Sequence, residues 1–65
     1  MMIEFEKWSD EDEYGVRESM GCHLMTEAQA VKWLDRYGGA LETPLGVYFD
    51  DDDIPGLIAL FDQDC

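Results

Sequence analysis

Acidic side chains gather in three short stretches of this sequence, and carboxylates can hold metal cations, act as acid–base catalysts or pair with lysine and arginine. The first stretch begins after Ser9, the second follows Phe49, and the third lies near the C-terminal end. Each chemistry needs something more: ligand spacing for a metal, a cleft for catalysis, or a basic partner for ion pairing. The candidate residues are Asp10, Glu11, Asp12, Glu13, Asp50, Asp51, Asp52, Asp53, Asp62 and Asp64.

The stretch from Asp51 to Asp62 resembles a calcium-binding EF-hand loop, with acidic residues at its two ends. Two features depart from that pattern: Pro55 stands where an oxygen ligand is needed, and Asp62 is shorter than the usual bidentate glutamate. No flanking helix is expected either. We therefore predict an acidic hairpin loop that binds Ca²⁺ or Mg²⁺ weakly, and a protein that needs no metal or other cofactor. The matching loop positions are Asp51, Asp53, Gly56, Ile58 and Asp62.

Nucleophilic chemistry has one candidate pair, the adjacent Cys22 and His23. Adjacent residues of a strand point to opposite faces, so the thiol and the imidazole are not expected to meet. One Cys-His dipeptide and a distant Cys65 do not supply the spaced ligand pairs of a structural zinc site. A chain of 65 residues that must also form a core has no room for a glycosidase-like cleft. We therefore expect no enzymatic activity.

The charge balance is strongly negative, with 16 Asp and Glu residues against 4 Lys and Arg residues and a net charge of −12. This balance disfavours direct binding to DNA, RNA or an anionic membrane, because phosphates are neutralised by clustered cations. A net charge of about 2 to 8 in magnitude suffices for a small soluble domain, and more like charge destabilises the fold. The excess favours a basic partner over a merely solvated surface or a halophilic origin.

Nothing in the sequence indicates export or membrane insertion. No segment reaches the roughly 18 consecutive apolar residues of a membrane span, and Met1 to Trp8 lacks the apolar region of a secretory signal. Two cysteines are fewer than a small secreted scaffold carries, so Cys22 and Cys65 are expected as reduced thiols. We expect a cytoplasmic protein.

Hydrophobic alternation over Met2–Trp8 and again over Tyr14–Met20 predicts two strands joined as an antiparallel hairpin. One amphipathic helix is predicted over Thr26–Tyr37. Thr26 and the residue three positions later form a capping-box pattern, and Gly38-Gly39 supplies the stop.

Two more strands are predicted over Leu45–Phe49 and over the apolar run Leu57–Phe61, with the residues between Leu41 and Pro44 as a connection. The whole chain, 1–65, is then a single domain of the α+β class. Its small antiparallel sheet, in ββαββ order, packs on one amphipathic helix. The expected core includes Ile3, Phe5, Val16, Ala30, Leu34, Val47, Ile58 and Leu60.

Strand spacing gives the carboxylates a possible role as phosphate substitutes. Residues on one face of a strand, such as Glu4 and Glu6, repeat about every 6.6 to 6.8 Å. This is near twice the 3.4 Å rise per nucleotide of one DNA strand, so such carboxylates imitate a row of phosphates. A pre-folded polyanion can therefore occupy the lysine- and arginine-lined channel of a nucleic-acid-binding protein.

In size, charge and element order, with the strand Met2–Trp8, the helix Thr26–Tyr37 and the strand Leu57–Phe61, the chain resembles the small acidic anti-CRISPR proteins of phages that imitate DNA, in particular a type I-C inhibitor. The resemblance implies a monomeric inhibitor that acts in an infected bacterial cell. Its basic partner would be a subunit of the crRNA-guided Cascade complex, which would no longer bind target DNA. The alternative is an antitoxin-like or regulatory module that binds a basic protein through apolar anchors such as Trp8, Trp33 or Tyr48.

Overall fold

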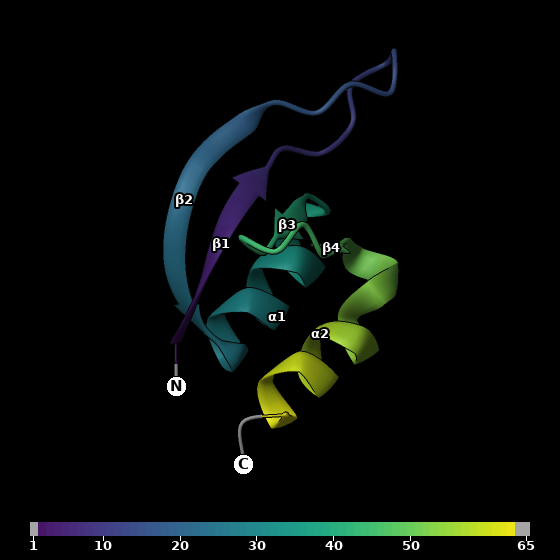
Figure 1. Cartoon of the computed structure of the whole chain (residues 1–65). Coiled ribbons are helices and arrows are strands. Elements are labelled where there is room, and N and C mark those ends of the chain that lie inside the picture. Colours follow the sequence, from purple (N-terminus) through teal and green to yellow (C-terminus); the bar gives the residue numbers. More distant parts are fainter. Residues whose placement is uncertain (1, 64–65) are drawn as a thin grey trace.

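Strand β1, Met2–Trp8, lies inside the sheet and sends alternate side chains to its two faces, so that Phe5 is fully buried whereas Glu4 is exposed. In the computed structural model, which describes residues 2–63, β1 pairs antiparallel with β2, Ser19–Thr26, and on its other side with β3, Ala40–Glu42. Strand β4, Tyr48–Phe49, pairs with β3. The result is a four-stranded antiparallel sheet in the order β2-β1-β3-β4 (Figure 1).

Helix α1, Glu27–Tyr37, confirms the predicted helix and both of its end signals. The Gln29 amide donates to the Thr26 hydroxyl over 3.2 Å, and the Thr26 amide donates back to Gln29 Oε1 over 3.0 Å. Gly38 adopts the left-handed conformation with φ 64° and donates its N–H to the Leu34 carbonyl, which closes the last turn. The α+β class is confirmed, and the predicted order is roughly consistent with the observed one, in which two strands, α1 and two further strands are followed by a second helix.

A second helix follows the four strands, and it corrects the prediction of a strand over Leu57–Phe61 and of a single helix. Helix α2, Ile54–Asp62, has Pro55 in its first turn, where a missing N–H costs no hydrogen bond. Leu57 and Phe61, four residues apart, both face the core. A continuous apolar run of this length fits a buried strand and a buried helix equally well, which is why the periodicity misled.

The first hairpin is longer than predicted, because β2 spans Ser19–Thr26 rather than Tyr14–Met20. Residues 9–18 form an extended loop, here called the arm, whose turn is closed by a hydrogen bond from the Asp12 amide to the Val16 carbonyl. Gly21 does not interrupt the strand. It lies within β2 at φ 89°, where the register against β1 shifts, as in a β-bulge.

The third and fourth strands also differ from the prediction. β3 occupies part of the segment predicted as a connection, and of Leu45–Phe49 only Tyr48 and Phe49 are in a strand. The remainder is a turn, in which the Thr43 amide donates to the Val47 carbonyl over 2.8 Å. Gly46 sits in this turn with φ 86°, a conformation that favours glycine.

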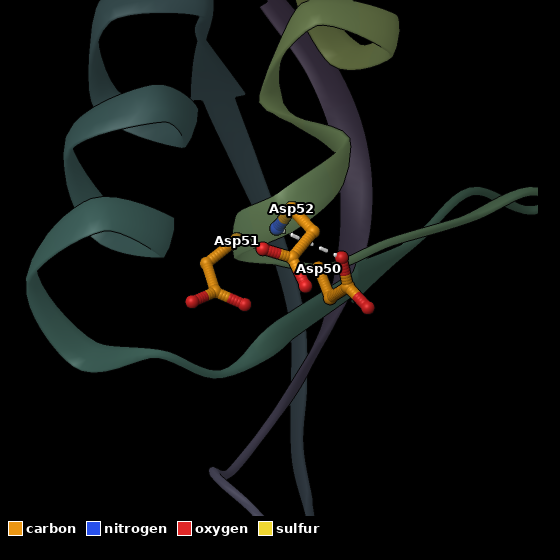
Figure 2. Close-up of side chains that lie close together, drawn as sticks. All are labelled: Asp50, Asp51 and Asp52. Atoms are coloured by element: carbon orange, nitrogen blue, oxygen red, sulfur yellow. Dashed lines mark hydrogen bonds between the residues drawn. The ribbon is translucent and has the colours of Figure 1, made fainter.

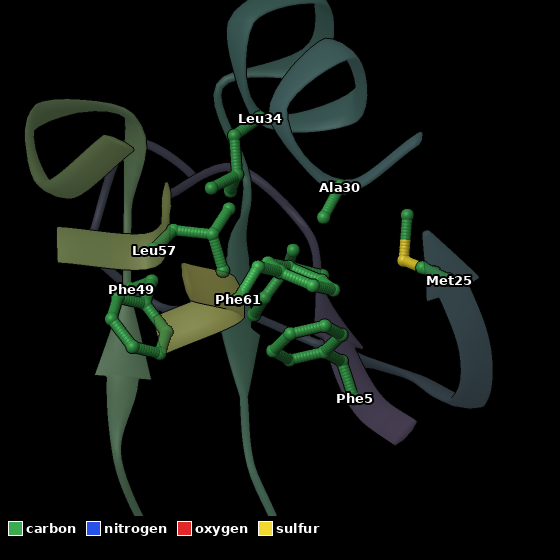
Figure 3. Close-up of a cluster of buried hydrophobic side chains, with 8 residues drawn as sticks. Phe5, Met25, Ala30, Leu34, Phe49, Leu57 and Phe61 are labelled. Carbon is green, nitrogen blue, oxygen red and sulfur yellow. The ribbon is translucent and has the colours of Figure 1, made fainter. Parts of the chain in front are cut away.

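The core lies between one face of the sheet and both helices, and Figure 3 shows the side chains that meet there. Of the predicted core residues, Phe5, Ala30 and Leu34 are buried, as expected. Ile3, Ile58 and Leu60 are half-buried, and the prediction was wrong for Val16 and Val47, which the two turns leave exposed. The buried cluster consists of Phe5, Met25, Ala30, Leu34, Leu41, Phe49, Leu57 and Phe61.

Neither helix in residues 2–63 has the length and apolar character needed to cross a bilayer.

The burial of Leu34 gives a test of the core. Leu34→Ala is expected to lower the free energy of unfolding by about 2 to 5 kcal/mol, because it removes a fully buried side chain and leaves a cavity. Val16→Ala, at a side chain that is 55% exposed, should change it by less than about 0.5 kcal/mol. Urea unfolding followed by circular dichroism measures both, and equal effects would contradict the described core.

Two glycines test the packing of the fold: Gly56 lies in α2, and Gly39 lies between α1 and β3. A Cβ at Gly56 would lie 3.7 Å from Phe49 Cε1, an ordinary contact, so Gly56→Ala is expected to stabilise α2 by about 0.5 to 1 kcal/mol. A Cβ at Gly39 would collide with the Trp8 carbonyl and the Trp33 ring, so Gly39→Ala should destabilise the protein by roughly 1 kcal/mol or more. A loss of stability in Gly56→Ala would argue against the helix.

Candidate functional site

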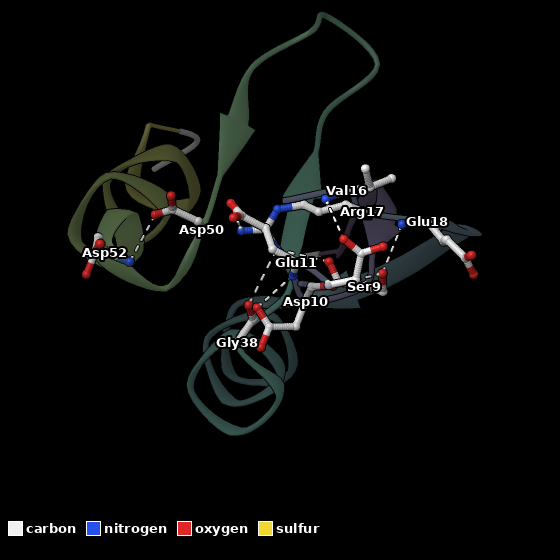
Figure 4. Close-up of polar contacts among 10 residues, drawn as sticks. Ser9, Asp10, Glu11, Val16, Arg17, Glu18, Gly38, Asp50 and Asp52 are labelled. Atoms are coloured by element: carbon white, nitrogen blue, oxygen red, sulfur yellow. Dashed lines mark hydrogen bonds and ion pairs between the residues drawn. The ribbon is translucent and has the colours of Figure 1, made fainter. Parts of the chain in front are cut away.

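The first acidic stretch, Asp10–Glu13, lies in the arm, where two of its carboxylates shape the backbone. Asp12 Oδ1 accepts hydrogen bonds from the amides of Tyr14 and Val16 over 2.8 and 3.0 Å. Asp10 Oδ1 accepts a hydrogen bond from the Glu11 amide; both residues are labelled in Figure 4. Side-chain oxygens of aspartate commonly close turns in this way. All four carboxylates are nevertheless exposed and add to the negative field of the arm.

The second stretch, Asp50–Asp53, is the start of the C-terminal helical segment and not a hairpin loop as predicted. Asp51–Asp53 form a turn of 3₁₀ helix, η1, that continues directly into α2. Asp50 caps this turn, because its Oδ1 accepts a hydrogen bond of 3.0 Å from the Asp52 amide. Carboxylates at a helix N-terminus are favourable, since the helix dipole is positive there. Part of this acidity therefore stabilises the fold.

Three of these carboxylates can be brought near one cation. One oxygen each from Asp50, Asp51 and Asp52 lies within 4.8 Å of the others (Figure 2). Such a group of hard oxygen ligands suits Ca²⁺ or Mg²⁺, but Asp51 and Asp52 are exposed and keep their hydration. The EF-hand pattern does not form, because Gly56, Ile58 and Asp62 are in α2 and Asp62 lies at its far end.

The third acidic stretch lies apart from the other two, at the far end of α2. Asp62 lies roughly 12 Å along α2 from the first residue of that helix, at 1.5 Å per residue. It borders a groove of about 1,110 Å³ between α1 and α2, with Val31, Ile54 and Ile58 among its apolar lining residues. Asp64, the last predicted site residue, lies outside the described residues.

The structure does bring the first two acidic stretches together. Glu11 of the arm and Asp50 ahead of η1 line one hollow of about 450 Å³, together with Glu42 of β3. Figure 4 shows Asp50 and Glu11 on neighbouring segments. The full lining is Trp8, Glu11, Gly15, Arg17, Glu42, Tyr48 and Asp50.

This hollow lies at the edge of a larger surface, the side of the sheet that faces away from the helices. Residues directly opposite each other in an antiparallel sheet share a face, and Phe5 faces the helices, so Glu4 and Glu6 face away from them. Glu42 was not predicted as a site residue, because its segment was taken for a connection. We call this surface the outer face; its members are Glu4, Glu6, Trp8, Cys22, Leu24, Glu42 and Tyr48.

The strand positions of the outer face carry no lysine or arginine, and one cation, Arg17 of the arm, lines the hollow at its edge. Lys7 faces the helices, with its Nζ 5.3 Å from the centre of the Trp33 ring, and Arg36 of α1 lies over Tyr37. Lys32 is also on α1. Arg17 of the arm forms the one ion pair found within residues 2–63, with Glu11 at 3.4 Å, and also donates to the Ser9 carbonyl. The described carboxylates are thus mostly without internal counterions.

Cys22 and His23 occupy opposite faces of β2, as the strand geometry predicted. Cys22 stands opposite Glu6 on the outer face, whereas His23 stands opposite Phe5. The imidazole Nε2 is 3.2 Å from the Met20 carbonyl, so it faces its own strand and not the thiol. Cys22 is an exposed free thiol, and Cys65 lies outside the described residues. These two residues do not form a nucleophilic dyad in this arrangement.

The exposed aspartates predict how the protein responds to divalent cations. We expect the melting temperature to be the same in EDTA and in micromolar Ca²⁺, with a rise of a few degrees only at millimolar Ca²⁺, because a ligand stabilises the folded state only when its concentration reaches or exceeds its dissociation constant. Differential scanning calorimetry measures this. A large rise at micromolar Ca²⁺ would show that the aspartates form a genuine metal site.

Comparison of the chain with protein-family models, with curated proteins and with solved structures finds no match, so function must be inferred from the site itself.

Proposed function

We propose that this protein is an inhibitor that imitates DNA and occupies the nucleic-acid-binding surface of a basic partner protein. The observation that carries the proposal is the lack of internal counterions: with 16 acidic residues, one ion pair is found within residues 2–63. Charge that the fold does not neutralise is available to a partner, and it raises the rate of encounter with a positively charged surface.

The geometry of β1 supports imitation of a phosphate backbone. Glu4 and Glu6 lie on one face of β1, in the part from Met2 to Glu6 where its pairing with β2 is regular, so they keep the spacing of about 6.6 to 6.8 Å on which the imitation depends. The molecule is 40 Å long, which corresponds to roughly 12 nucleotides at 3.4 Å each. Both features suit a ligand that replaces a short stretch of DNA in a basic channel.

The proposed partner is a DNA-binding subunit of a type I Cascade complex, and the proposed place of action is the cytoplasm of an infected bacterial cell. The inhibitor would act as a monomer, without catalysis and without a cofactor, because occupancy of the channel alone excludes target DNA. It would contact the partner and not the nucleic acid, since its net charge of −12 repels phosphates.

The groove between α1 and α2 favours a second candidate function, an antitoxin-like or regulatory module that binds a basic protein through apolar contacts. Val31, Ile54 and Ile58 line this groove, and Glu27, Asp35 and Asp62 lie beside them. Such a surface suits an amphipathic helix with basic flanks. One substitution distinguishes the two functions. Ile58→Asp would strongly weaken the binding of a partner in the groove, and it would have little effect on the binding of a partner that contacts the DNA-mimic surface.

Competition with DNA tests the main proposal. Increasing amounts of the protein should displace target DNA from purified type I-C Cascade in a mobility-shift assay, and inhibition should weaken as salt rises, because the contacts are carboxylate to lysine or arginine. Replacing all four residues of Asp50–Asp53 by Asn should slow association if that segment faces the partner. Asn keeps the capping oxygen of Asp50, so the fold is retained.

Glu27→Gln and Asp35→Asn on α1 are the controls, and their effect should be smaller, because Lys32 and Arg36 dilute the negative field there. A Cascade complex that binds DNA and this protein together, with no loss of affinity for either, would rule out the mimicry.

A further inference from the structure

The outer face of the sheet is a surface on which no element of residues 2–63 packs as a layer. α1 and α2 both pack on the opposite face, where Phe5, Leu41 and Phe49 are buried (Figures 1 and 3). The register then fixes what the outer face presents. Glu4 stands opposite Leu24, and Glu6 stands between Cys22 on β2 and Glu42 on β3.

Two glutamates of this face stand directly opposite each other on neighbouring strands. Glu6 and Glu42 form a cross-strand pair, with Cα atoms about 4.5 to 5.5 Å apart in this kind of pairing, and like charges in such a pair repel. Glu6 accepts a hydrogen bond from the Ser19 hydroxyl, which does not neutralise it. Neither glutamate forms an ion pair within the described chain. A cation supplied from outside would relieve this repulsion.

Apolar and aromatic side chains accompany the acidic ones. Leu24 is 62% exposed and Tyr48, which stands opposite Glu42, is 44% exposed. A carboxylate beside an exposed aromatic ring suits a guanidinium group, which pairs with the carboxylate in its plane and stacks on the ring with its face. Lysine, a compact and strongly hydrated charge, uses such a pair of neighbours less well.

We propose that the outer face, and not the acidic arm or the aspartates ahead of α2, docks onto the partner, and that it receives arginine side chains of the partner's DNA-binding surface. Glu4, Glu6 and Glu42 would pair with these arginines, and Tyr48 would stack on one of them. Charge complementarity identifies the occupant: the strand positions of this face carry three glutamates and no lysine or arginine. Arg17, at the edge of the face, is already paired with Glu11, and the other three cations, Lys7, Lys32 and Arg36, lie on the helical side. The inference rests on the proposed function and names the surface that performs it.

An octa-arginine peptide serves as a probe that does not require the partner. In ¹⁵N-labelled protein at low salt, the largest amide shifts on titration are expected at Glu4, Glu6, Glu42 and Tyr48. Octa-lysine should bind more weakly than octa-arginine. Shifts concentrated in Asp10–Glu13 or Asp51–Asp53 would overturn the inference, as would equal affinity for the two peptides.

Two matched triple variants complete the test, since each removes three negative charges from a different surface. Replacing Glu4, Glu6 and Glu42 by Gln should raise the dissociation constant for octa-arginine about tenfold or more, whereas replacing Asp51, Asp52 and Asp53 by Asn should raise it by less than about threefold. Similar losses in both variants, or the larger loss in the aspartate variant, would overturn the inference.

The same two variants, assayed for displacement of DNA from Cascade, separate the two proposals. If the wild-type protein displaces DNA and the aspartate variant alone loses this activity, the proposed function stands and the docking face is wrong. If the wild-type protein does not displace DNA, the proposed function fails, while the peptide titration still reports which face binds arginine. Circular dichroism and urea unfolding check the fold of each variant; the glutamine variant should fold well, because it removes the repulsion between Glu6 and Glu42.

Discussion

The fold depends on one buried core, in which the contact between Phe5 of β1 and Phe61 of α2 joins the first strand to the last helix. Their rings lie 6.0 Å apart at an angle of 49°, a favourable tilted packing within the buried cluster. The core must oppose the mutual repulsion of a chain with a net charge of −12. A chain this short covers only one face of its sheet, so forming the core on one side leaves the other side exposed.

The sequence predicted those elements that local chemistry alone determines. The prediction of α1 was correct at both ends, because Thr26, Gln29 and Gly38 cap the helix through hydrogen bonds to residues within one turn of the backbone. The strand over Met2–Trp8 was correct because it alternates over its full length. α2 was missed for the opposite reason: its apolar residues allow either structure, and the choice is made by long-range packing of Leu57 and Phe61 onto the sheet.

The candidate site was predicted only in part, because composition locates charge along the chain but does not tell what each carboxylate does. Asp12 and Asp50 appeared as members of acidic clusters, yet both accept backbone hydrogen bonds that shape the arm and the start of the last helix. Glu42 was overlooked, since only the register of β3 against β1 places it beside Glu6. Long-range strand pairing of this kind leaves no signal at the position itself.

Strand pairing is what distinguishes the outer face from the other acidic surfaces. A carboxylate on a paired strand is held at a fixed spacing before any partner arrives, so association loses less conformational freedom than when an acidic loop must become ordered. The aspartates ahead of α2 sit in a helix-dipole environment that already favours their charge, and a partner cation must compete with it. Glu6 and Glu42 have the opposite environment, because each disfavours the charge of the other. The free energy gained by pairing with a partner cation is therefore largest for the carboxylates that have no favourable electrostatic environment within the fold.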